Sequence, residues 1–327
     1  MALGQLVEGN WVSKREQEDS HGRFLRPSTT FRARITADGS SGFKAEAGRY
    51  HLYISWACPW ANRTAIMRKL KGLEDAIGLS VVDPVMGEEG WVFSDFPGSI
   101  PDTVNGTHYL RDIYLKADPK HTGRVTVPVL WDKETNKIVN NESRELIRML
   151  DTEFDAVVKS DKNFYPEDLR EAIDQTIDTI YQPINNGVYR AGFATEQKAY
   201  DEAVTQLFDA LDYWEEILGK QRYLCGDSPN GDSSASRITE ADWCMFTTLF
   251  RFDAVYYVHF KCNLRHIYEY PNLWNYLKDL YQQPGVKETC NLEHIKLHYY
   301  KSHPNVNPHG LVPKGPILDF ESPHNRY

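Results

Sequence analysis

The sequence lacks several features that define broad protein classes. Its longest apolar runs, such as residues 77–82, are far shorter than the about 20 residues that a membrane-spanning helix needs. It also lacks an excess of positive charge, because the formal net charge is −9, and this argues against binding to nucleic-acid phosphates. No charged segment followed by an apolar stretch opens the chain, so we expect no secretory signal. We therefore expect neither a membrane partner nor a nucleic-acid partner.

Cysteine is scarce, and its pattern does not suggest pairing. The cysteines are odd in number and widely spaced, and none form a C-x-x-C pair, so the sequence disfavours a disulfide framework and a cysteine zinc site. This usage predicts free thiols in a reducing compartment, which we expect to be the cytoplasm. The five cysteines are Cys58, Cys225, Cys244, Cys262 and Cys290. We expect the last four to be inert packing residues.

The length and the aromatic content are the positive features of the composition. A chain of 327 residues is roughly twice the size of a common domain, so two domains are expected. Aromatic residues make up 13% of the chain, with 19 Tyr and 8 Trp, which favours stacking surfaces as well as core.

The first half of the chain has the pattern of an α/β domain. Residues 1–47 show no sustained periodicity and are expected to form an arm. Residues 50–55 and 77–82 are predicted strands, and residues 61–71 between them form a predicted helix that ends at a glycine. A strand, a helix and a strand in about thirty residues indicate a βαβ unit with parallel strands. We expect residues 86–123 to be an irregular functional insertion.

The α/β pattern continues to about residue 155, and helical periodicity follows. Residues 125–131 predict a strand interrupted by Pro128, residues 137–139 predict its hairpin partner, and a capped helix begins after residues 140–143. Apolar residues at spacings of three and four then predict helices over residues 169–180, 197–218, 239–258 and 273–282. We expect a capping box at residues 239–242 and a surface tail after about residue 303.

The sharpest local motif is the sequence Ser-Trp-Ala-Cys-Pro-Trp-Ala at residues 55–61. It places Cys58 between a strand and a helix, directly before Pro59, which suits a first helical position. Free N–H groups and the helix dipole stabilise a thiolate at such a helix start, which predicts a lowered pKa and a reactive cysteine. Ala61 stands where a dithiol enzyme has its second cysteine, so an external thiol must resolve a mixed disulfide on Cys58.

Two further motifs fit the recognition of a peptide-like thiol. Val127-Pro128 opens a strand, and in a thioredoxin-like domain this is the place of a cis proline that turns a backbone N–H and C=O toward a bound peptide-like thiol. Only about 5–6% of X–Pro bonds are cis, so the motif gains its weight from standing beside Cys58-Pro59. Glu142 and Ser143 open a helix, where a carboxylate and an ammonium group can both be bound, although ordinary N-capping explains the pair equally well.

Together these motifs resemble the cysteine-type glutathione transferases, and more specifically the xi class, the glutathionyl-hydroquinone reductases. The resemblance covers essentially the whole chain. It rests on residues 57–61, 124–132, 141–143, 185–194, 251–261 and 298–303. One departure is Asn62, where some members carry histidine. The resemblance implies a thioredoxin-like glutathione-binding domain over residues 48–155, an all-helical glutathione-transferase domain over residues 156–327, and a homodimer.

The resemblance also implies roles for individual residues. Cys58 is expected to be the nucleophile and Trp91 to stack on glutathione. Tyr189 is expected to exchange a proton with the quinol, while Tyr256 and Tyr299 hydrogen-bond near the cysteine sulfur. The remaining contacts to glutathione are expected from Arg124, Val125, Thr126, Val127, Glu142 and Ser143.

The expected reaction is the reduction of glutathionyl-hydroquinones through a disulfide between Cys58 and glutathione, with glutathione as co-substrate and no metal. The pair His294 and His298 has helical spacing but no third ligand nearby in sequence, so we expect surface or packing roles for both. Two alternatives stay open at this point. One is an omega-like thiol transferase or dehydroascorbate reductase, and the other is a non-enzymatic module that binds glutathione-conjugated ligands or proteins.

Overall fold

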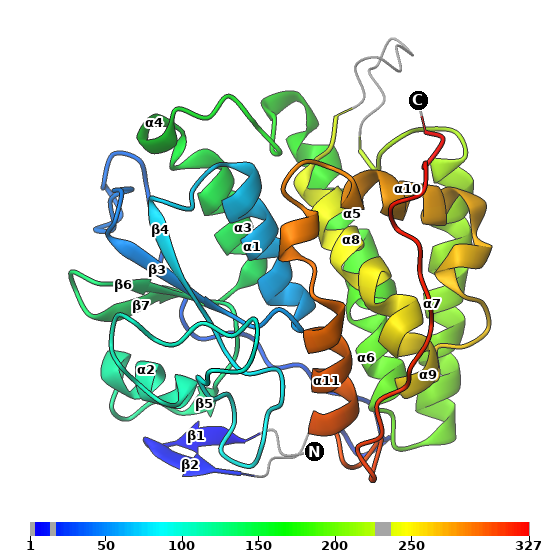
Figure 1. The fold of residues 1–327 in the computed structure, drawn as a ribbon, viewed down its shortest axis with the longest axis horizontal. Helices are drawn as coiled ribbons and strands as arrows, with labels where there is room; N and C mark the ends of the chain where they lie inside the picture. The colour runs from blue at the N-terminus through cyan, green and yellow to red at the C-terminus, as the bar shows by residue number, and fades with distance from the viewer. Residues whose placement is uncertain (1–3, 14–17, 226–236, 327) are drawn as a thin grey trace. The chain divides into compact units, whose positions relative to one another are not determined.

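The computed structural model of the protein describes residues 4–13, 18–225 and 237–326. The chain forms two compact units (Figure 1). The first unit comprises residues 1–16, 27–162 and 288–312. The second unit comprises residues 17–26, 163–287 and 313–327. Both units are therefore assembled from segments that are far apart in the sequence.

The first unit is built on a mixed four-stranded sheet with the order β4-β3-β6-β7. Its strands are β3 (Tyr50–Ile54), β4 (Ile77–Val81), β6 (Val129–Asp132) and β7 (Lys137–Asn140). β3 pairs in parallel with β4 and antiparallel with β6, and β6 pairs antiparallel with β7. Every residue of β3 is buried, as the β-branched and aromatic run predicts. The predicted α/β arrangement is confirmed.

A second, small antiparallel sheet has the order β2-β1-β5. Its strands are β1 (Gln5–Val7), β2 (Asn10–Val12) and β5 (Gly123–Arg124). The first part of the expected arm thus contains two short strands, which its sequence did not indicate, because strands of three residues show no periodicity. The expected strand over residues 125–131 is interrupted at Pro128, so that β6 begins only at Val129.

The helices of the first unit include α1 and α3, which pack on one another and lie side by side in Figure 1. Pro59 occupies the first turn of α1, and Gly72, with a left-handed φ of 69°, follows the end of the helix, as predicted. The helices are α1 (Pro59–Leu70), α2 (Leu110–Ala117), α3 (Ser143–Thr152), α4 (Asp155–Val158) and α11 (Leu292–Ser302).

The expected irregular insertion over residues 86–123 is only partly irregular, because α2 lies within it. Its first part is held by the buried carboxylate of Asp102, which accepts hydrogen bonds from the Tyr53 hydroxyl (2.9 Å) and the Thr107 backbone N–H (3.0 Å). The prediction missed α2 because two helical turns with only Leu110, Ile113 and Tyr114 buried give too short a periodic pattern.

The second unit is helical, as predicted, with α7 packed against α6 and α10. Its α-helices are α5 (Arg170–Ile180), α6 (Gly187–Gly192), α7 (Gln197–Leu218), α8 (Glu240–Arg251), α9 (Tyr257–His259) and α10 (Pro271–Tyr281). Two π-helical turns, Tyr181–Asn185 and Phe252–Tyr256, interrupt the helical rows before α6 and after α8. Short 3₁₀ turns cover Glu167–Leu169 and Ile267–Glu269, and a third, Lys287–Thr289, begins in this unit and ends in the first.

The predicted capping box at the start of α8 is present. The Asp242 carboxylate accepts from the Thr239 backbone N–H (2.8 Å) and hydroxyl (3.0 Å). It also accepts from the Leu224 N–H and the Tyr276 hydroxyl, both at 2.9 Å, so this buried acid ties three segments of the second unit together. Burial raises the pKa of Asp242, and the donors around it oppose that effect.

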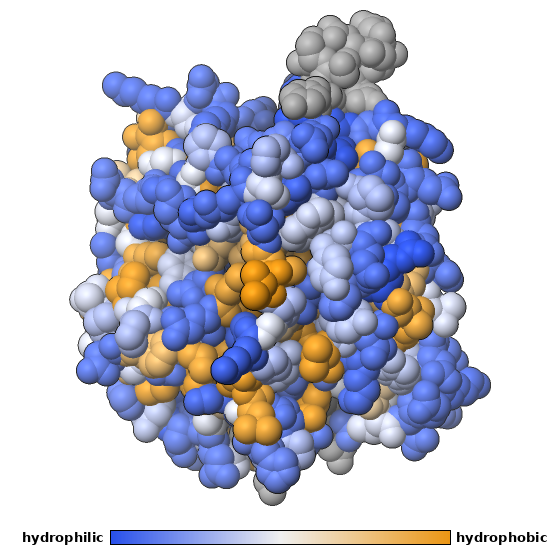
Figure 2. All heavy atoms as spheres, turned by 45° about the vertical axis from the view of Figure 1, so that its right-hand side comes forward, coloured by the Kyte–Doolittle hydropathy of each residue, from blue (hydrophilic) through white to orange (hydrophobic). Residues whose placement is uncertain are grey.

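The surface drawn in Figure 2 is mostly hydrophilic with scattered apolar patches. Exposed large apolar side chains include Tyr213, Val258, Leu264, Tyr268 and Ile317. Within the part of the chain that the structure describes, no helix combines the length and the apolar character that crossing a membrane requires.

Candidate active site

Cys58 is the N-cap residue of α1, and its backbone carbonyl accepts from the Asn62 N–H at 2.9 Å. The side chain is half-buried. Its sulfur lies 3.7 Å from the carbonyl oxygen of Val127, the residue whose bond to Pro128 is cis. The first turn of α1 carries no acidic residue, so no negative side chain of this helix opposes a thiolate at its N-terminus. The structure therefore brings two sequence-predicted motifs, around Cys58 and Val127, into direct contact.

Tyr114 on α2 connects the segments predicted to contact glutathione, and sequence reasoning missed it. Its hydroxyl donates to the Thr126 carbonyl oxygen (2.8 Å) and accepts from the Thr126 N–H (3.1 Å). It also accepts from the side-chain amide of Asn141 at 3.1 Å. The side chain is fully buried, and burial raises the pKa of its phenol. Its only sequence signal is the apolar face that Tyr114 shares with Leu110 and Ile113 on a two-turn helix.

Glu142 and Ser143 open α3, as predicted. Glu142 is the N-cap residue, and its carboxylate accepts from the Arg144 N–H and from the Thr29 hydroxyl, each at 3.2 Å. Ser143, the first residue of the helix, is almost wholly buried. The N-capping role is thus present, and Thr29 brings a segment from before β3 to the same carboxylate.

Trp91, Arg124 and Tyr299 also belong to the first unit. The indole of Trp91 is only 8% exposed and stacks on the imidazole of His298, with ring centroids 4.9 Å apart and planes at 19°. Arg124 ends β5, which pairs with β1, and its side chain is half-buried. Tyr299 is buried on α11, where its ring lies edge-on to that of His303 at 5.6 Å.

Tyr189 and Tyr256 belong to the second unit, where their ring centroids are 6.0 Å apart. Tyr189 lies on α6 directly after one π-helical turn, and Tyr256 closes the other. Such turns are frequent at functional sites. The N-terminal segment adds Arg26, whose guanidinium lies 4.7 Å above the Tyr189 ring and donates to the Asn186 side chain at 2.7 Å. Arg26 lies in the arm, where no sequence motif indicated a functional residue.

The cysteines of the second unit have environments that disfavour a thiolate. Burial raises the pKa of Cys225 to about 12, and burial also raises the pKa of Cys262 well above its ordinary value. Cys244 is fully buried on α8. These environments agree with packing roles for all three.

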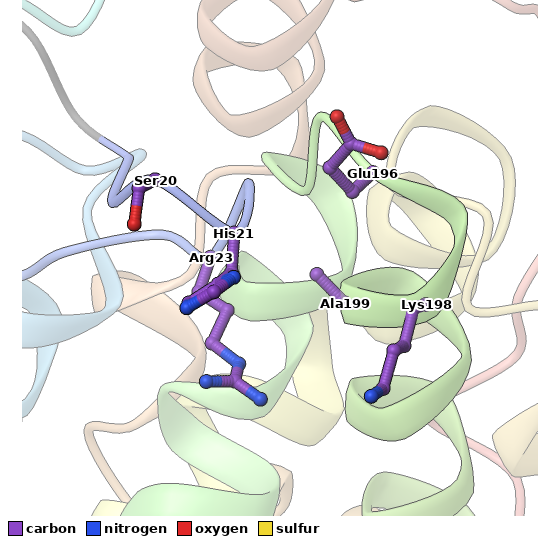
Figure 3. Close-up of a pocket in the computed structure, with 6 residues that line it drawn as sticks. All are labelled: Ser20, His21, Arg23, Glu196, Lys198 and Ala199. Carbon is purple, nitrogen blue, oxygen red and sulfur yellow. The ribbon is translucent and has the colours of Figure 1, made fainter.

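The second unit also contains a pocket of about 490 Å³ that includes none of the sequence-predicted site residues (Figure 3). Its lining residues are Ser20, His21, Arg23, Glu196, Lys198 and Ala199. Across residues 4–13, 18–225 and 237–326, no group of three or more His, Cys, Asp or Glu side chains is arranged to hold a metal ion.

Comparisons with known proteins identify the family to which the chain belongs. Family models described as the N-terminal and C-terminal domains of glutathione S-transferase match residues 57–153 and 197–279. The glutathionyl-hydroquinone reductase YqjG of Escherichia coli (strain K12) is 49% identical over 99% of this chain and 98% of its own. The glutathionyl-hydroquinone reductase PcpF of Sphingobium chlorophenolicum is also 49% identical, over 96% of each chain.

Solved structures agree with these relatives. A xi-class glutathione transferase from Natrialba magadii superposes with a TM-score of 0.92 at 54% identity and covers 99% of this chain and 97% of its own. The glutathione-bound structure of YqjG superposes with a TM-score of 0.89 and covers 99% of each chain. The predicted fold class, a thioredoxin-like domain followed by an all-helical one, is therefore confirmed. The chain belongs to the glutathione S-transferase family, and within it to the xi class that includes the glutathionyl-hydroquinone reductases.

Proposed function

We propose that this protein reduces glutathionyl-hydroquinones to hydroquinones, with glutathione as co-substrate. The observation that carries the proposal is the contact between the Cys58 sulfur, at the N-terminus of α1, and the Val127 carbonyl before cis Pro128. This contact combines a nucleophile with main-chain groups that can bind a peptide-like thiol. Relatives that are 49% identical over nearly the whole chain bear the name of this activity.

The first step is attack of the Cys58 thiolate on the sulfur of the glutathionyl-hydroquinone. A sulfur–sulfur bond forms and the bond between that sulfur and the aromatic carbon breaks. The electron pair of the broken bond remains on the aromatic carbon, which takes up a proton, and the hydroquinone leaves. Cys58 and glutathione are then joined as a mixed disulfide.

The second step regenerates the enzyme. A second glutathione thiolate attacks the glutathione sulfur of the mixed disulfide, releases oxidised glutathione and returns Cys58 to the thiolate. The only other cysteine in the first unit, Cys290, has no assigned role in this scheme, since an external thiol resolves the disulfide. The proposed chemistry uses no metal.

The first unit supplies the groups proposed to hold glutathione. Main-chain groups of Val127 bind the tripeptide beside the cysteine, and Trp91 stacks on its backbone. Glu142 and Ser143 hold the γ-glutamyl end, where the carboxylate of Glu142 pairs with the ammonium group and the start of α3 binds the carboxylate. The other proposed contacts come from Arg124, Val125 and Thr126.

Tyrosines supply the proposed proton chemistry. Tyr189 exchanges the proton at the quinol, and Tyr256 and Tyr299 donate hydrogen bonds near the cysteine sulfur. A phenol is a suitable donor because it holds its proton at neutral pH and can hydrogen-bond a thiolate. The guanidinium of Arg26 lies above the Tyr189 ring, and this cation–π contact supports the proposed role of Tyr189 by holding its ring in place.

We further propose a homodimer in the cytoplasm, with no nucleic-acid or membrane partner, and a division between the domains near residue 155. Exposed apolar side chains of the second unit, among them Val258 and Leu264, support association with a second copy. Free cysteines support a reducing compartment.

The test is turnover of a glutathionyl-hydroquinone with excess glutathione, followed by chromatography of the hydroquinone and of oxidised glutathione. We expect one oxidised glutathione for each hydroquinone released. Cys58→Ser should lower the rate at least about a thousandfold because it removes the nucleophile, while the matched control Cys225→Ser should retain it. Activity in Cys58→Ser would contradict the proposal. Reduction of dehydroascorbate without reduction of the conjugate would favour the omega-like alternative.

A further inference from the structure

Helix α11 presents a row of buried polar side chains to a loop of its own unit. His294, His298 and Ser302 follow one another at intervals of four residues, so they share one face of the helix. They are 0%, 7% and 2% exposed, respectively. Polar side chains at this depth need hydrogen-bond partners. Each of them has a hydrogen-bond partner in residues 84–98, which we call the Trp91 loop.

Each of the three side chains bonds the backbone of the Trp91 loop. His294 Nε2 lies 2.7 Å from the Pro97 carbonyl oxygen, and His298 Nδ1 lies 3.0 Å from the Pro84 carbonyl oxygen. A carbonyl oxygen only accepts, so each of these ring nitrogens carries the proton and donates. The Ser302 hydroxyl accepts from the Met86 N–H at 2.9 Å. The row on α11 therefore holds both ends of the loop.

His298 does more than bond the backbone, because its ring also stacks on Trp91. The ring centroids are 4.9 Å apart and the planes differ by 19°. The backbone of Trp91 is fixed independently, since its carbonyl accepts from the Leu110 N–H at 3.0 Å. The stack with His298 therefore restrains the orientation of the indole side chain. The hydrogen bond from Nδ1 to the Pro84 carbonyl in turn keeps the imidazole from rotating away from the indole.

We infer that His298 is a positioning residue that sets the indole plane of Trp91 for binding the glutathione moiety of both substrates. This inference rests on the proposed function, in which Trp91 stacks on glutathione. A pre-oriented indole lowers the entropy that binding must overcome, so loss of the stack weakens binding of glutathione. The chemical step at Cys58 needs no group from His298 in the proposed scheme, so kcat at saturating substrate changes little.

Four variants separate the stack from the hydrogen bond. His298→Asn keeps an amide N–H close to the place of Nδ1 and removes the ring, whereas His298→Phe keeps a ring and removes the bond to Pro84. His294→Phe is the matched control, because it makes the same change one turn earlier on α11, where the imidazole faces Phe96 and Pro97 rather than Trp91. Trp91→Ala completes a double-mutant cycle with His298→Asn.

The readout is the Kd for S-methylglutathione, measured by calorimetry, because this thioether cannot form a disulfide with Cys58. We expect His298→Asn to weaken binding about tenfold, equivalent to about 1.4 kcal/mol. His298→Phe, which keeps a ring but loses the bond that orients it, should weaken binding less than His298→Asn does, and His294→Phe should change it less than about threefold. In the Trp91→Ala background, His298→Asn should have no further effect, since a positioning role acts only through the indole. The KM for glutathione should follow the Kd, with kcat changed less than about twofold.

Two results would overturn the inference: wild-type affinity in His298→Asn, or the same fold-change with and without Trp91. Thermal unfolding checks that each variant is folded, and His298→Leu replaces His298→Asn in the cycle if that variant is not. If the wild type binds S-methylglutathione and the cycle is non-additive but no hydroquinone is released in turnover, only the proposed function fails. If turnover occurs and the cycle is additive, only the role of His298 fails.

Discussion

Cys58 combines partial exposure with a position at a helix N-terminus, and neither Cys244 nor Cys262 has both features. It is half-buried at the start of α1, whereas Cys244 and Cys262 are fully buried. The thiolate is the reactive form of a cysteine, so the pKa and the exposure of each thiol decide how fast it reacts with an alkylating reagent.

We therefore expect selective alkylation of Cys58. Brief treatment with iodoacetamide at pH 7 should modify Cys58 before Cys225 and Cys262, whose pKa values burial raises. Peptide mass spectrometry measures the order of labelling, and urea-unfolded protein, in which all five thiols react, is the control. Equal labelling of Cys58 and Cys225 in the folded protein would contradict a special environment for Cys58.

The buried His51 on β3 makes stability depend on pH. Its Nε2 donates to the Ser80 hydroxyl at 2.8 Å, which in turn donates to the Pro101 carbonyl oxygen. Burial lowers the pKa of His51 to about 4, below the value of about 6.5 in an unfolded chain. Between these values the unfolded state binds more protons, so the contribution is fully present above about pH 6.5 and is lost as the pH falls toward 4.

We expect this group to remove about 3 kcal/mol from the free energy of unfolding between pH 6.5 and pH 4. His51→Gln keeps a donor toward Ser80 but does not titrate, so its stability should fall less over the same interval. Urea unfolding at several pH values gives both slopes. Parallel slopes in wild type and His51→Gln would contradict the assignment.

At the scale of elements, α8 depends on the acid in its first turn. Asp242 accepts four hydrogen bonds from Thr239, Leu224 and Tyr276, and all of these groups are inside the second unit. Asp242→Ala leaves these donors unpaired and should cost about 3–5 kcal/mol, whereas Thr239→Ala should cost about 1–2 kcal/mol.

Chemical unfolding of the two variants measures this difference. The exposed Glu216 on α7 offers a control, because Glu216→Ala should change the free energy of unfolding by less than about 0.5 kcal/mol. A loss in Asp242→Ala no larger than that in Thr239→Ala would show that the buried acid does not connect the segments.

The sequence predicted the elements that carry a local signal. β3, α1 and β4 follow from a β-branched run, Pro59 and Gly72, and the start of α8 follows from its capping box. α2 and the strands β1 and β2 escaped prediction, because two helical turns or three residues of strand are shorter than any periodicity that could identify them.

At the scale of the molecule, neither unit is a continuous stretch of chain. Residues 288–312 return to the first unit, and residues 17–26 of the arm belong to the second. The expected domain boundary near residue 155 stays a prediction. Dividing the chain at that position would separate α11 from the Trp91 loop, to which its side chains bond.

A chain that ends at residue 162 therefore lacks the side chains that bond Pro84, Met86 and Pro97. We expect limited proteolysis to cleave the Trp91 loop at least about tenfold faster in this truncation than in the full chain, since local opening exposes the cleavage site. Mass spectrometry of the fragments locates the cuts. Equal protection of residues 84–98 in both proteins would contradict the role of α11.

The candidate site shows the same limit on prediction. The motifs around Cys58, Val127 and Glu142 are local, and the sequence identified each of them. The partner of Trp91 lies 207 positions later, at His298, and no local pattern links the two rings. The helical pair His294 and His298 predicts only surface or packing roles from the sequence, because their hydrogen-bond partners, Pro97 and Pro84, lie about 200 positions earlier in the chain.

The central claim is that Cys58 takes glutathione from the conjugate and leaves the ring behind, and one single-turnover measurement tests it most directly. The protein is mixed with one equivalent of a glutathionyl-hydroquinone without free glutathione, and intact-protein mass spectrometry and chromatography are recorded together. We predict a mass increase of one glutathione on Cys58, reversed by added glutathione, with one equivalent of free hydroquinone. An unmodified Cys58 with an intact conjugate, or an adduct that retains the aromatic ring, would contradict the account.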